Sequence, residues 1–286
     1  MKSTWISYFH HKLKTDVALK EALREVEFPA IDLKKIHPES MFYDDNLLSN
    51  LSSSEHYAGI SPGMSRIADA VCGLIKRHPP SGVTDISVLK LDGLTCSKTG
   101  GRSLADFSMR LYLPHEYYYE NPIRFNTDED FLSNVAHFES RFKDDGLVYH
   151  RAWDSKYFIA NSDGSHHLAA LYRQCQEQGR QYMMRCRVQE HTLDVQNCKF
   201  ILDMYYPLII HEDAKYGLSR LLREFGMDCR LSKLRDECGL IYLPKAHRQS
   251  WVVYELLLNR LAPGEIYDLR KYLGDILATA EATLLK

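Results

Sequence analysis

The spacing of apolar residues predicts helices in the first part of the chain. Near residue 85 this spacing changes from helical to strand-like. Residues 16–25 consist of good helix formers. A second predicted helix has its apolar residues on one face, at Ile67, Ala70, Val71, Leu74 and Ile75. The Ser-rich segment 49–54 is predicted as a loop, and the Pro-rich segment 78–82 ends the second helix. We therefore expect a helical N-terminal region over residues 1–82.

The middle of the chain opens with strand-like patterns. Residues 86–91 form a short apolar run, and apolar residues alternate with polar ones over residues 107–113, which predicts a strand. Residues 127–142 are predicted as a helix, because acidic residues occupy its first turn and large apolar residues recur at helical spacing. Thr127 or Asp128 is expected to cap the N-terminus of this helix.

The order of the elements that follow is the most informative part of the pattern. Residues 147–149 and 157–160 are predicted as two short strands that form a hairpin around Asp154–Lys156. A helix is expected to begin near His166 and to end at Gly179, with another strand at residues 182–189. The sequence thus predicts a strand, a tight polar turn, a helix and a further strand.

In the C-terminal third of the chain, apolar residues again recur at helical spacing. Apolar residues form one helical stripe at Leu218, Leu221, Leu222 and Phe225. A short strand is predicted at residues 240–243 and another helix at residues 251–261. Residues 263–264 separate this helix from a final helix of about 20 residues. We expect an α+β fold in which a small mixed-sheet core, residues 83–199, is flanked by helical regions at residues 1–82 and 200–286.

Composition narrows the class of protein. Hydrophobic residues make up 45% and charged residues 26% of the 286 residues, which is typical of a globular chain. The 36 basic and 38 acidic residues give a net charge of −2, which excludes non-specific nucleic-acid binding through a bulk positive field. The seven cysteines include no CxxC pair, and no apolar run approaches the roughly 20 residues of a membrane helix. We predict a cytoplasmic protein with reduced thiols and no membrane association.

The candidate chemistry lies at the polar turn before the helix that begins near His166. The first turn of a helix leaves backbone N–H groups without intrahelical partners, and the helix dipole favours an anion there. Gly164 permits a sharp turn, Ser165 adds a hydroxyl, and the imidazoles of His166 and His167 add donors. Asp163 precedes them and is a candidate general base. The simpler alternative is that Asp163 or Ser165 only caps the helix.

Residues 107–189 resemble the ParB/sulfiredoxin superfamily. The segment Glu120-Asn121-Pro122-Ile123-Arg124-Phe125 precedes the predicted helix 127–142, as the Pro–Arg segment does in that superfamily. The segment Asp163-Gly164-Ser165-His166-His167 occupies the place of its "DGxHR" or "GERR" turn. The resemblance implies a small α/β domain that binds a nucleotide, such as CTP, ATP or ADP, together with Mg²⁺. It also implies that Gly164, Ser165, His166 and His167 contact phosphate and that Arg124 matches the conserved arginine.

The turn also departs from the superfamily pattern. Sulfiredoxins carry a nucleophilic cysteine where Ser165 stands, and a serine hydroxyl is far less acidic, so sulfinate repair is not expected. His167 replaces an arginine that binds phosphate in a bidentate way, which predicts weaker or pH-sensitive binding unless Arg173 or Arg110 supplies the charge. No histidine or cysteine spacing matches a metal-ligand pattern, so no metal site is predicted apart from nucleotide-bound Mg²⁺.

Three classes of function remain open from the sequence. The first is a nucleotide-binding protein that catalyses NTP hydrolysis or phosphoryl transfer, with Asp163 and His166 as candidate catalytic residues. The second is a ParB-like nucleic-acid-binding protein or nuclease. The third is a non-catalytic interaction module of a phage or another prokaryotic mobile element. In each case the C-terminal helices are the expected site for a protein partner or for homodimer formation.

Overall fold

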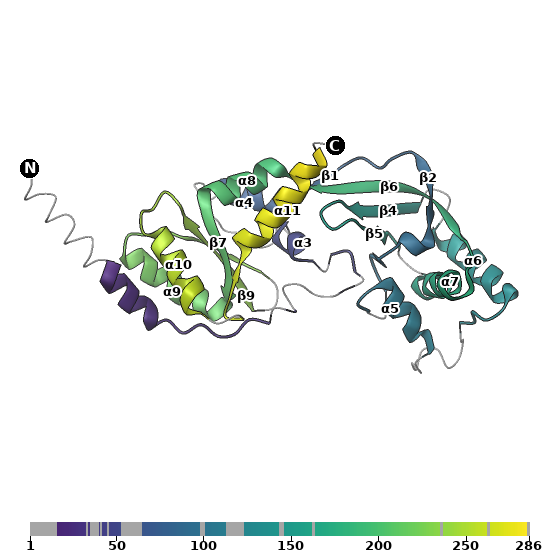
Figure 1. Ribbon diagram of the computed structural model, residues 1–286, viewed down its shortest axis with the longest axis horizontal. Coiled ribbons are helices and arrows are strands. Elements are labelled where there is room, and N and C mark those ends of the chain that lie inside the picture. Colours follow the sequence, from purple (N-terminus) through teal and green to yellow (C-terminus); the bar gives the residue numbers. More distant parts are fainter. Residues whose placement is uncertain are drawn as a thin grey trace, which may run out of the picture. The chain divides into compact units, whose positions relative to one another are not determined.

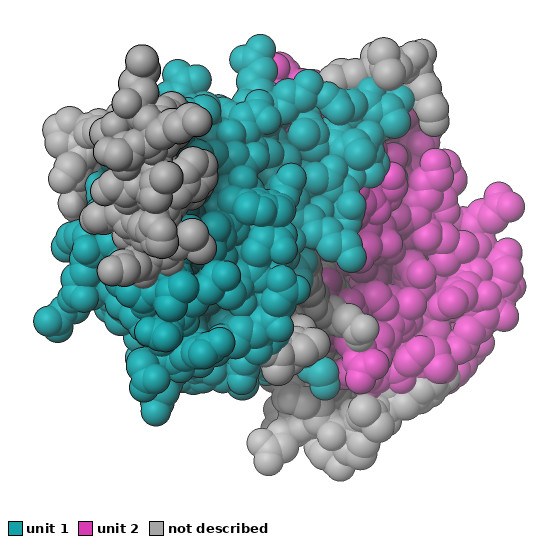
Figure 2. All heavy atoms as spheres, turned by 60° about the vertical axis from the view of Figure 1, so that its left-hand side comes forward, with its two compact units in different colours: residues 1–35, 50–74, 194–286 teal, residues 36–49, 75–193 magenta. Residues whose placement is uncertain are grey.

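The computed structural model contains two compact units, which Figure 2 colours separately. Unit 1 comprises residues 1–35, 50–74 and 194–286, and unit 2 comprises residues 36–49 and 75–193. Each unit contains a β-sheet with helices packed against it, which confirms the α+β prediction. The structure describes residues 16–32, 34, 40, 42–44, 46–52, 65–97, 101–112, 123–142, 146–161, 164–234, 237–261 and 264–284.

The sheet of unit 2 is mixed and is built around one long strand. Its strands are β1 (Ile75–Arg77), β2 (Val83–Ser87), β3 (Gly93–Leu94), β4 (Gly146–Arg151), β5 (Lys156–Ile159) and β6 (Met183–Leu193). The strand order is β1-β6-β4-β5-β3, and β2 also pairs with β6 beside β1. The pairs β3/β5 and β4/β6 are parallel, whereas the remaining pairs are antiparallel.

Three α-helices of unit 2 pack against one face of this sheet (Figure 1). They are α5 (Leu104–Met109), α6 (Asp128–Phe142) and α7 (Ser165–Gln178), and the short 3₁₀ helices η3 (Val88–Lys90) and η4 (Arg110–Tyr112) accompany them. Val148 and Ile159 of the sheet share a buried core with Phe107, Phe138 and Leu168 of the helices. The apolar face predicted for α7 is therefore the face that covers the sheet.

The structure confirms the type and order of the helices and strands predicted for residues 127–189. The Thr127 hydroxyl accepts a hydrogen bond from the Asp130 amide at 3.1 Å, which caps α6 as expected. β4 and β5 form the predicted hairpin, in which Ser155 adopts a left-handed turn conformation with φ of 55°. The helix predicted near His166 is α7, and the strand predicted at residues 182–189 is the first part of β6.

The strand predicted at residues 107–113 is wrong. Helix α5 occupies this segment and continues into η4, while residue 113 lies outside the described residues. The Ser103 side chain caps α5 by accepting a hydrogen bond from the Asp106 amide at 3.1 Å. A few alternating residues fit a helix as well as a strand, and this cap together with the burial of Phe107 favours the helix.

The sheet of unit 1 is antiparallel and lies between two sets of helices. Its strands, in sheet order, are β10 (Ile266–Asp268), β7 (Tyr205–His211), β9 (Cys238–Pro244) and β8 (Arg230–Lys233). On one face, α9 (Glu212–Glu224), α10 (Ser250–Arg260) and the helix at residues 16–24 share a buried core with the sheet. On the other face, α8 (Val195–Met204) and α11 (Leu269–Leu284) contact β7, and α4 (Ser65–Cys72) contacts α8.

The predicted division into regions 1–82, 83–199 and 200–286 differs from the two units of the structure. Leu19 and Leu23 of the N-terminal helix are buried in the same core as α9 and α10, so this helix completes the C-terminal unit. The C-terminal region is also only partly helical, because it contributes all four strands of the unit 1 sheet. No described helix combines the length and the apolar character needed to cross a membrane.

Two local predictions in the N-terminal region also need correction. The Ser-rich segment predicted as a loop forms α3 (Leu47–Ser52), whose N-terminus is capped by the Asn46 side chain, and residues 53–54 lie outside the described residues. Leu48 and Leu51 of α3 are buried, which explains the helix. The predicted helix with Ile67 ends at Cys72, and Ile75 begins β1.

Candidate phosphate-binding site

The N-terminus of α7 lies at the sheet edge where β3 and β5 both end. These strands are parallel, with Gly93 opposite Phe158 and Leu94 opposite Ile159, so the chain leaves both strands at the same edge. After β3 it continues through residues 95–97, and after β5 it leads through residues 160–164 into α7. Ligands of open α/β sheets commonly bind at such carboxyl ends.

Asn161 joins the two loops at this edge. The Asn161 amide N–H donates to the Thr95 hydroxyl, and this hydroxyl donates to the Asn161 carbonyl, both at 3.0 Å. The Asn161 side chain accepts from the Cys96 amide at 3.3 Å and donates to the Cys96 carbonyl at 2.9 Å. These bonds fix the position of the β3 loop, and hence of Ser97, relative to the start of α7.

Gly164 is the N-cap residue of α7 and has a left-handed conformation, with φ of 75° and ψ of 10°. A glycine adopts this conformation without strain. Because Gly164 has no side chain, it supplies no side-chain acceptor for the first-turn amides. A Cβ atom at this position would lie 3.6 Å from Cβ and Cγ of Arg141, so the stem of this exposed arginine on α6 lies beside the turn.

The Ser165 hydroxyl faces the β3 loop. Ser165 is buried, and its Oγ lies 3.0 Å from the Ser97 Oγ and 3.5 Å from His166 Nδ1. The hydroxyls of Ser165 and Ser97 therefore form a bridge between the helix and the loop that follows β3.

The side chains of His166 and His167 contact different parts of the unit. The His166 ring lies edge-on to Phe107, with ring centroids 5.1 Å apart. His167 is stacked on His137 of α6 with centroids 3.7 Å apart, and its Nδ1 lies 2.8 Å from Asn134 Oδ1. An amide oxygen only accepts, so Nδ1 of His167 carries the proton and donates this bond. The structure thus places an imidazole pair between the first turn of α7 and the last turns of α6.

Arg124 is linked to the same network through its backbone. Asn134 Nδ2 donates to the Arg124 carbonyl at 2.8 Å and to Gln174 Oε1 at 3.1 Å, while the Arg124 side chain is exposed. The structure therefore brings together four predicted site residues, namely Gly164, Ser165, His166 and His167, and connects Arg124 to them through Asn134. Asp163 lies outside the described residues.

Arg173 and Arg110, the arginines expected to replace the missing turn arginine, both form ion pairs with acidic side chains. Arg173 pairs with Glu177 at 2.9 Å and lies eight residues into α7, about 12 Å along its axis. Arg110 pairs with Asp106 at 2.9 Å. Arg141 is the basic residue that the fold places beside Gly164. The sequence pattern gave no signal for Arg141, because its proximity depends on how α6 packs against α7.

The described cysteines are all free thiols, and most are buried. Burial raises the pKa of Cys186 to about 11 and that of Cys198 to about 12, so these thiols stay protonated near neutral pH. Cys96 is exposed and lies in the β3 loop at the candidate site. Among the described residues, no group of three or more His, Cys, Asp or Glu side chains is placed to hold a metal ion.

The protein thus has an α+β fold of two units, and its helix α7 begins on a left-handed glycine at the edge where β3 and β5 end. Residues 83–285 match the model of a family described as "Family of unknown function (DUF6685)". The match covers most of the chain, including the candidate site, and the chain belongs to this family. No curated protein and no solved structure matches the chain.

Proposed function

We propose that this protein binds a phosphate-bearing ligand, either a nucleotide or another phosphate ester, at the N-terminus of α7. The observation that supports this most directly is that α7 begins on a left-handed glycine at the edge where two parallel strands end. The first-turn amides and the positive end of the dipole of a 14-residue helix favour an anion there. Gly164 also lets a ligand approach the backbone closely.

The surroundings of the turn favour an anion as well. The stem of Arg141 lies beside Gly164. One of the hydroxyls of Ser97 and Ser165 donates to the other, so this pair offers at most one hydroxyl hydrogen to a ligand at the same edge. His167 donates from Nδ1 to Asn134, which fixes the orientation of its ring on the first turn of α7. A phosphate group with several acceptor oxygens matches such a set of donors.

The order of the elements supports a nucleotide as the ligand. Helix α6, the β4–β5 hairpin, helix α7 and strand β6 follow one another as in the superfamily that the sequence resembles. CTP, ATP and ADP, each with Mg²⁺, are therefore the first ligands to test. Because His166 is directed at Phe107, we propose ligand binding as the primary role of the site. NTP hydrolysis or phosphoryl transfer, with Asp163 as the base, would be a second step on the same ligand.

A calorimetric binding screen tests this proposal. CTP, ATP, ADP, GTP and inorganic phosphate are titrated into the full chain with and without Mg²⁺, and unfolding is followed in parallel. A ligand at 100 times its Kd should stabilise the folded protein by about 2.7 kcal/mol. Absence of binding by every member of this panel would refute the proposal.

The two ends of α7 offer a matched pair of variants. Gly164 and Gly179 flank the helix, and both adopt left-handed conformations, with φ of 75° and 65°. Gly164→Asp places a carboxylate at the site and should weaken phosphate binding more than tenfold through charge repulsion. Gly179→Asp introduces the same residue and similar strain at the other end and should leave binding unchanged. Equal binding by both variants would exclude the N-terminus of α7 as the site.

A further inference from the structure

Unit 1 carries a cluster of aromatic rings that reaches the surface where α10 begins. This aromatic cluster consists of Tyr206 of β7 and of Trp251 and Tyr254 of α10. The two tyrosine rings are stacked with centroids 4.8 Å apart, and the Trp251 ring lies 5.6 Å from each of them. Trp251 is 47% exposed. The cluster belongs to unit 1, whereas α7 belongs to unit 2, so it requires an explanation of its own.

The core of unit 1 holds the two tyrosines of the aromatic cluster in place. Tyr254 is buried in this core, and Tyr206 packs against it. The Tyr254 hydroxyl also donates to the Asp268 carboxylate at 2.8 Å, which links α10 to β10. The exposed indole of Trp251 therefore rests on two rings that are already fixed. A ligand that stacks on this indole meets a formed surface, which limits the entropy lost on binding.

Two positive charges lie beside the same rings. The Lys245 ammonium lies 5.0 Å from the centroid of the Tyr206 ring, and the Arg270 guanidinium lies 5.8 Å from it. Both distances are within the range of a cation–π contact. β9 and β10 both pair antiparallel with β7, so the chain leaves each of them toward the start of β7. This topology brings Lys245, which follows β9, and Arg270, which follows β10, to the aromatic cluster.

The two cations are not neutralised by ion pairs within the described part of the chain. Lys245 donates to the Leu202 carbonyl, and the Arg270 side chain is hydrogen-bonded to the Tyr254 hydroxyl. The Asp268 carboxylate accepts instead from the Tyr254 hydroxyl and from the Arg270 backbone amide. Burial and the nearby Arg270 charge lower the pKa of the Lys245 ammonium, so the two cations repel each other. A bound anion would relieve this repulsion.

We propose that this surface binds single-stranded nucleic acid, with a base stacked on Trp251 and backbone phosphates held by Lys245 and Arg270. Every base has a face that can stack on an indole, and the phosphates match the two cations in charge. A duplex is disfavoured because its bases are already stacked within the helix. A cationic ligand, which aromatic rings also attract, is disfavoured because Lys245 and Arg270 repel it. The net charge of −2 makes binding depend on this local surface.

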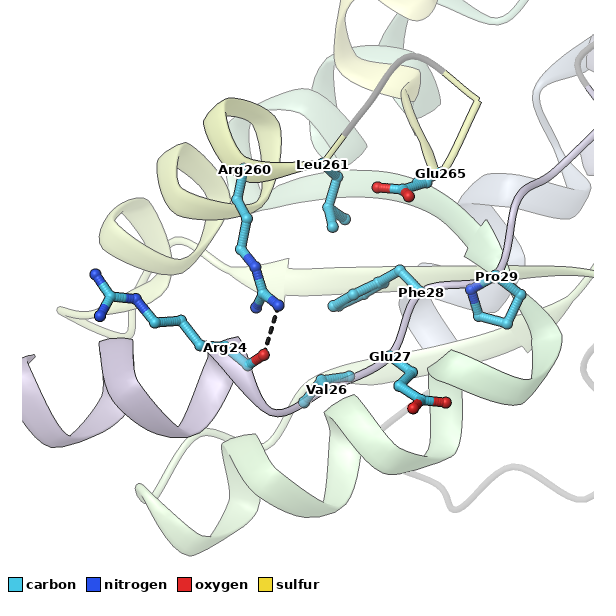
Figure 3. Close-up of a pocket in the computed structure, with 8 residues that line it drawn as sticks. All are labelled: Arg24, Val26, Glu27, Phe28, Pro29, Arg260, Leu261 and Glu265. Carbon is cyan, nitrogen blue, oxygen red and sulfur yellow. Dashed lines mark hydrogen bonds between the residues drawn. The ribbon is translucent and has the colours of Figure 1, made fainter.

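The other end of α10 supplies a control position. Arg260 at that end donates to the Arg24 carbonyl beside a surface pocket (Figure 3). The charged end of the exposed Arg24 side chain points away from this pocket (Figure 3). Trp251 lies nine residues before Arg260, about 13 Å along the helix. Arg24 is therefore an exposed cation of the same unit that lies outside the proposed surface.

The test uses fluorescein-labelled single strands of DNA and RNA, each of about 15 nucleotides, whose anisotropy is followed as the full chain is added. We expect saturable binding that weakens as the salt concentration rises. A DNA duplex of the same sequence should bind at least tenfold more weakly. The proposal is overturned if neither single strand binds at low salt, or if the duplex binds as tightly as the single strands.

Three variants then locate the strand. Trp251→Ala should weaken its binding at least fivefold, whereas Trp251→Phe keeps an aromatic face and should retain most of the affinity. Arg270→Gln should weaken binding and should lower the slope of log K against log salt concentration by about 0.7, the value for one phosphate contact on a single strand. Arg24→Gln removes an equal charge and should change neither quantity.

The same variants separate this surface from the α7 site and from self-association. Gly164→Asp should leave binding of the single strand unchanged, and Trp251→Ala should leave nucleotide binding unchanged, so each proposal can fail without the other. Full affinity in folded Trp251→Ala would overturn the present one. Sedimentation velocity gives the oligomeric state. A native dimer that Trp251→Ala converts to monomers, with no strand bound by either, would also overturn it and would assign the aromatic cluster to contact between copies.

Discussion

Acidification from pH 7 to pH 5 should destabilise unit 2 through one buried histidine. His191 of β6 is 2% exposed, its ring is stacked on Tyr149, and its Nδ1 is hydrogen-bonded to the Tyr43 hydroxyl. Its Nε2 is buried and has no hydrogen-bond partner among the described residues. Burial, with a further contribution from the Arg77 and His78 charges, lowers the pKa of His191 to about 4. The folded protein therefore holds this imidazole neutral.

The size and sign of the effect follow from proton linkage. The unfolded chain protonates this histidine below about pH 6.5, whereas the folded chain protonates it only below about pH 4. The unfolded state binds the extra proton between these values, so stability falls as the pH is lowered through this window. The full effect is about 3 kcal/mol, of which about 2 kcal/mol is lost by pH 5.

The measurement is urea unfolding at pH 7 and at pH 5 for the native protein and for His191→Gln. Glutamine does not titrate and keeps an acceptor for the Tyr43 hydroxyl, so the variant should lose about 2 kcal/mol less over this pH range. His137→Gln, at a half-buried histidine of the same unit, is the control, and NMR titration measures the pKa of His191 directly. An NMR pKa near 6.5, or the same pH dependence in native protein and His191→Gln, would refute the reasoning.

Three further predictions concern single side chains and use urea or thermal unfolding. Gly217→Ala lies in the exposed middle of α9 with nothing within 4 Å of the new Cβ, and should stabilise the protein by about 0.5–1 kcal/mol. Gly164→Ala should cost about 1 kcal/mol because its φ of 75° strains any other residue. Lys215→Met should cost about 3 kcal/mol, because Lys215 is buried and its ammonium pairs with Glu212 at 2.8 Å; adding Glu212→Gln should recover part of this loss.

The elements that the sequence predicted correctly are those with local signals that agree with one another. Helix α6 has the Thr127 cap directly before it, and it has an acidic first turn and apolar residues at helical spacing within its own 15 residues. The β4–β5 hairpin has a polar turn at Asp154–Lys156 between two apolar runs. The apolar residues in segment 107–113 fit both the helical and the strand period. The Ser103 cap and the packing of α5 against α7 favour the helix.

The candidate site was predictable only in part for the same reason. Gly164, Ser165, His166 and His167 are adjacent in the chain, so the turn and the helix that follows it could be recognised from the sequence. Ser97, Asn134 and Arg141 reach the site only because β3 pairs with β5 and α6 packs against α7. Nothing in the spacing of these residues distinguishes them from other polar residues.

The sequence by itself determined the α+β class, the helices α6 and α7, the hairpin between them in the chain, and the turn at Gly164. Only the tertiary structure decided which segments share a core. Tyr43 meets His191 across 148 residues of chain, and the helix at residues 16–24 joins α9 and α10. The physical reason is that periodicity reports which face of an element is buried but not what covers it. Loop closure costs little more for a long loop than for a short one, so distant partners compete almost equally.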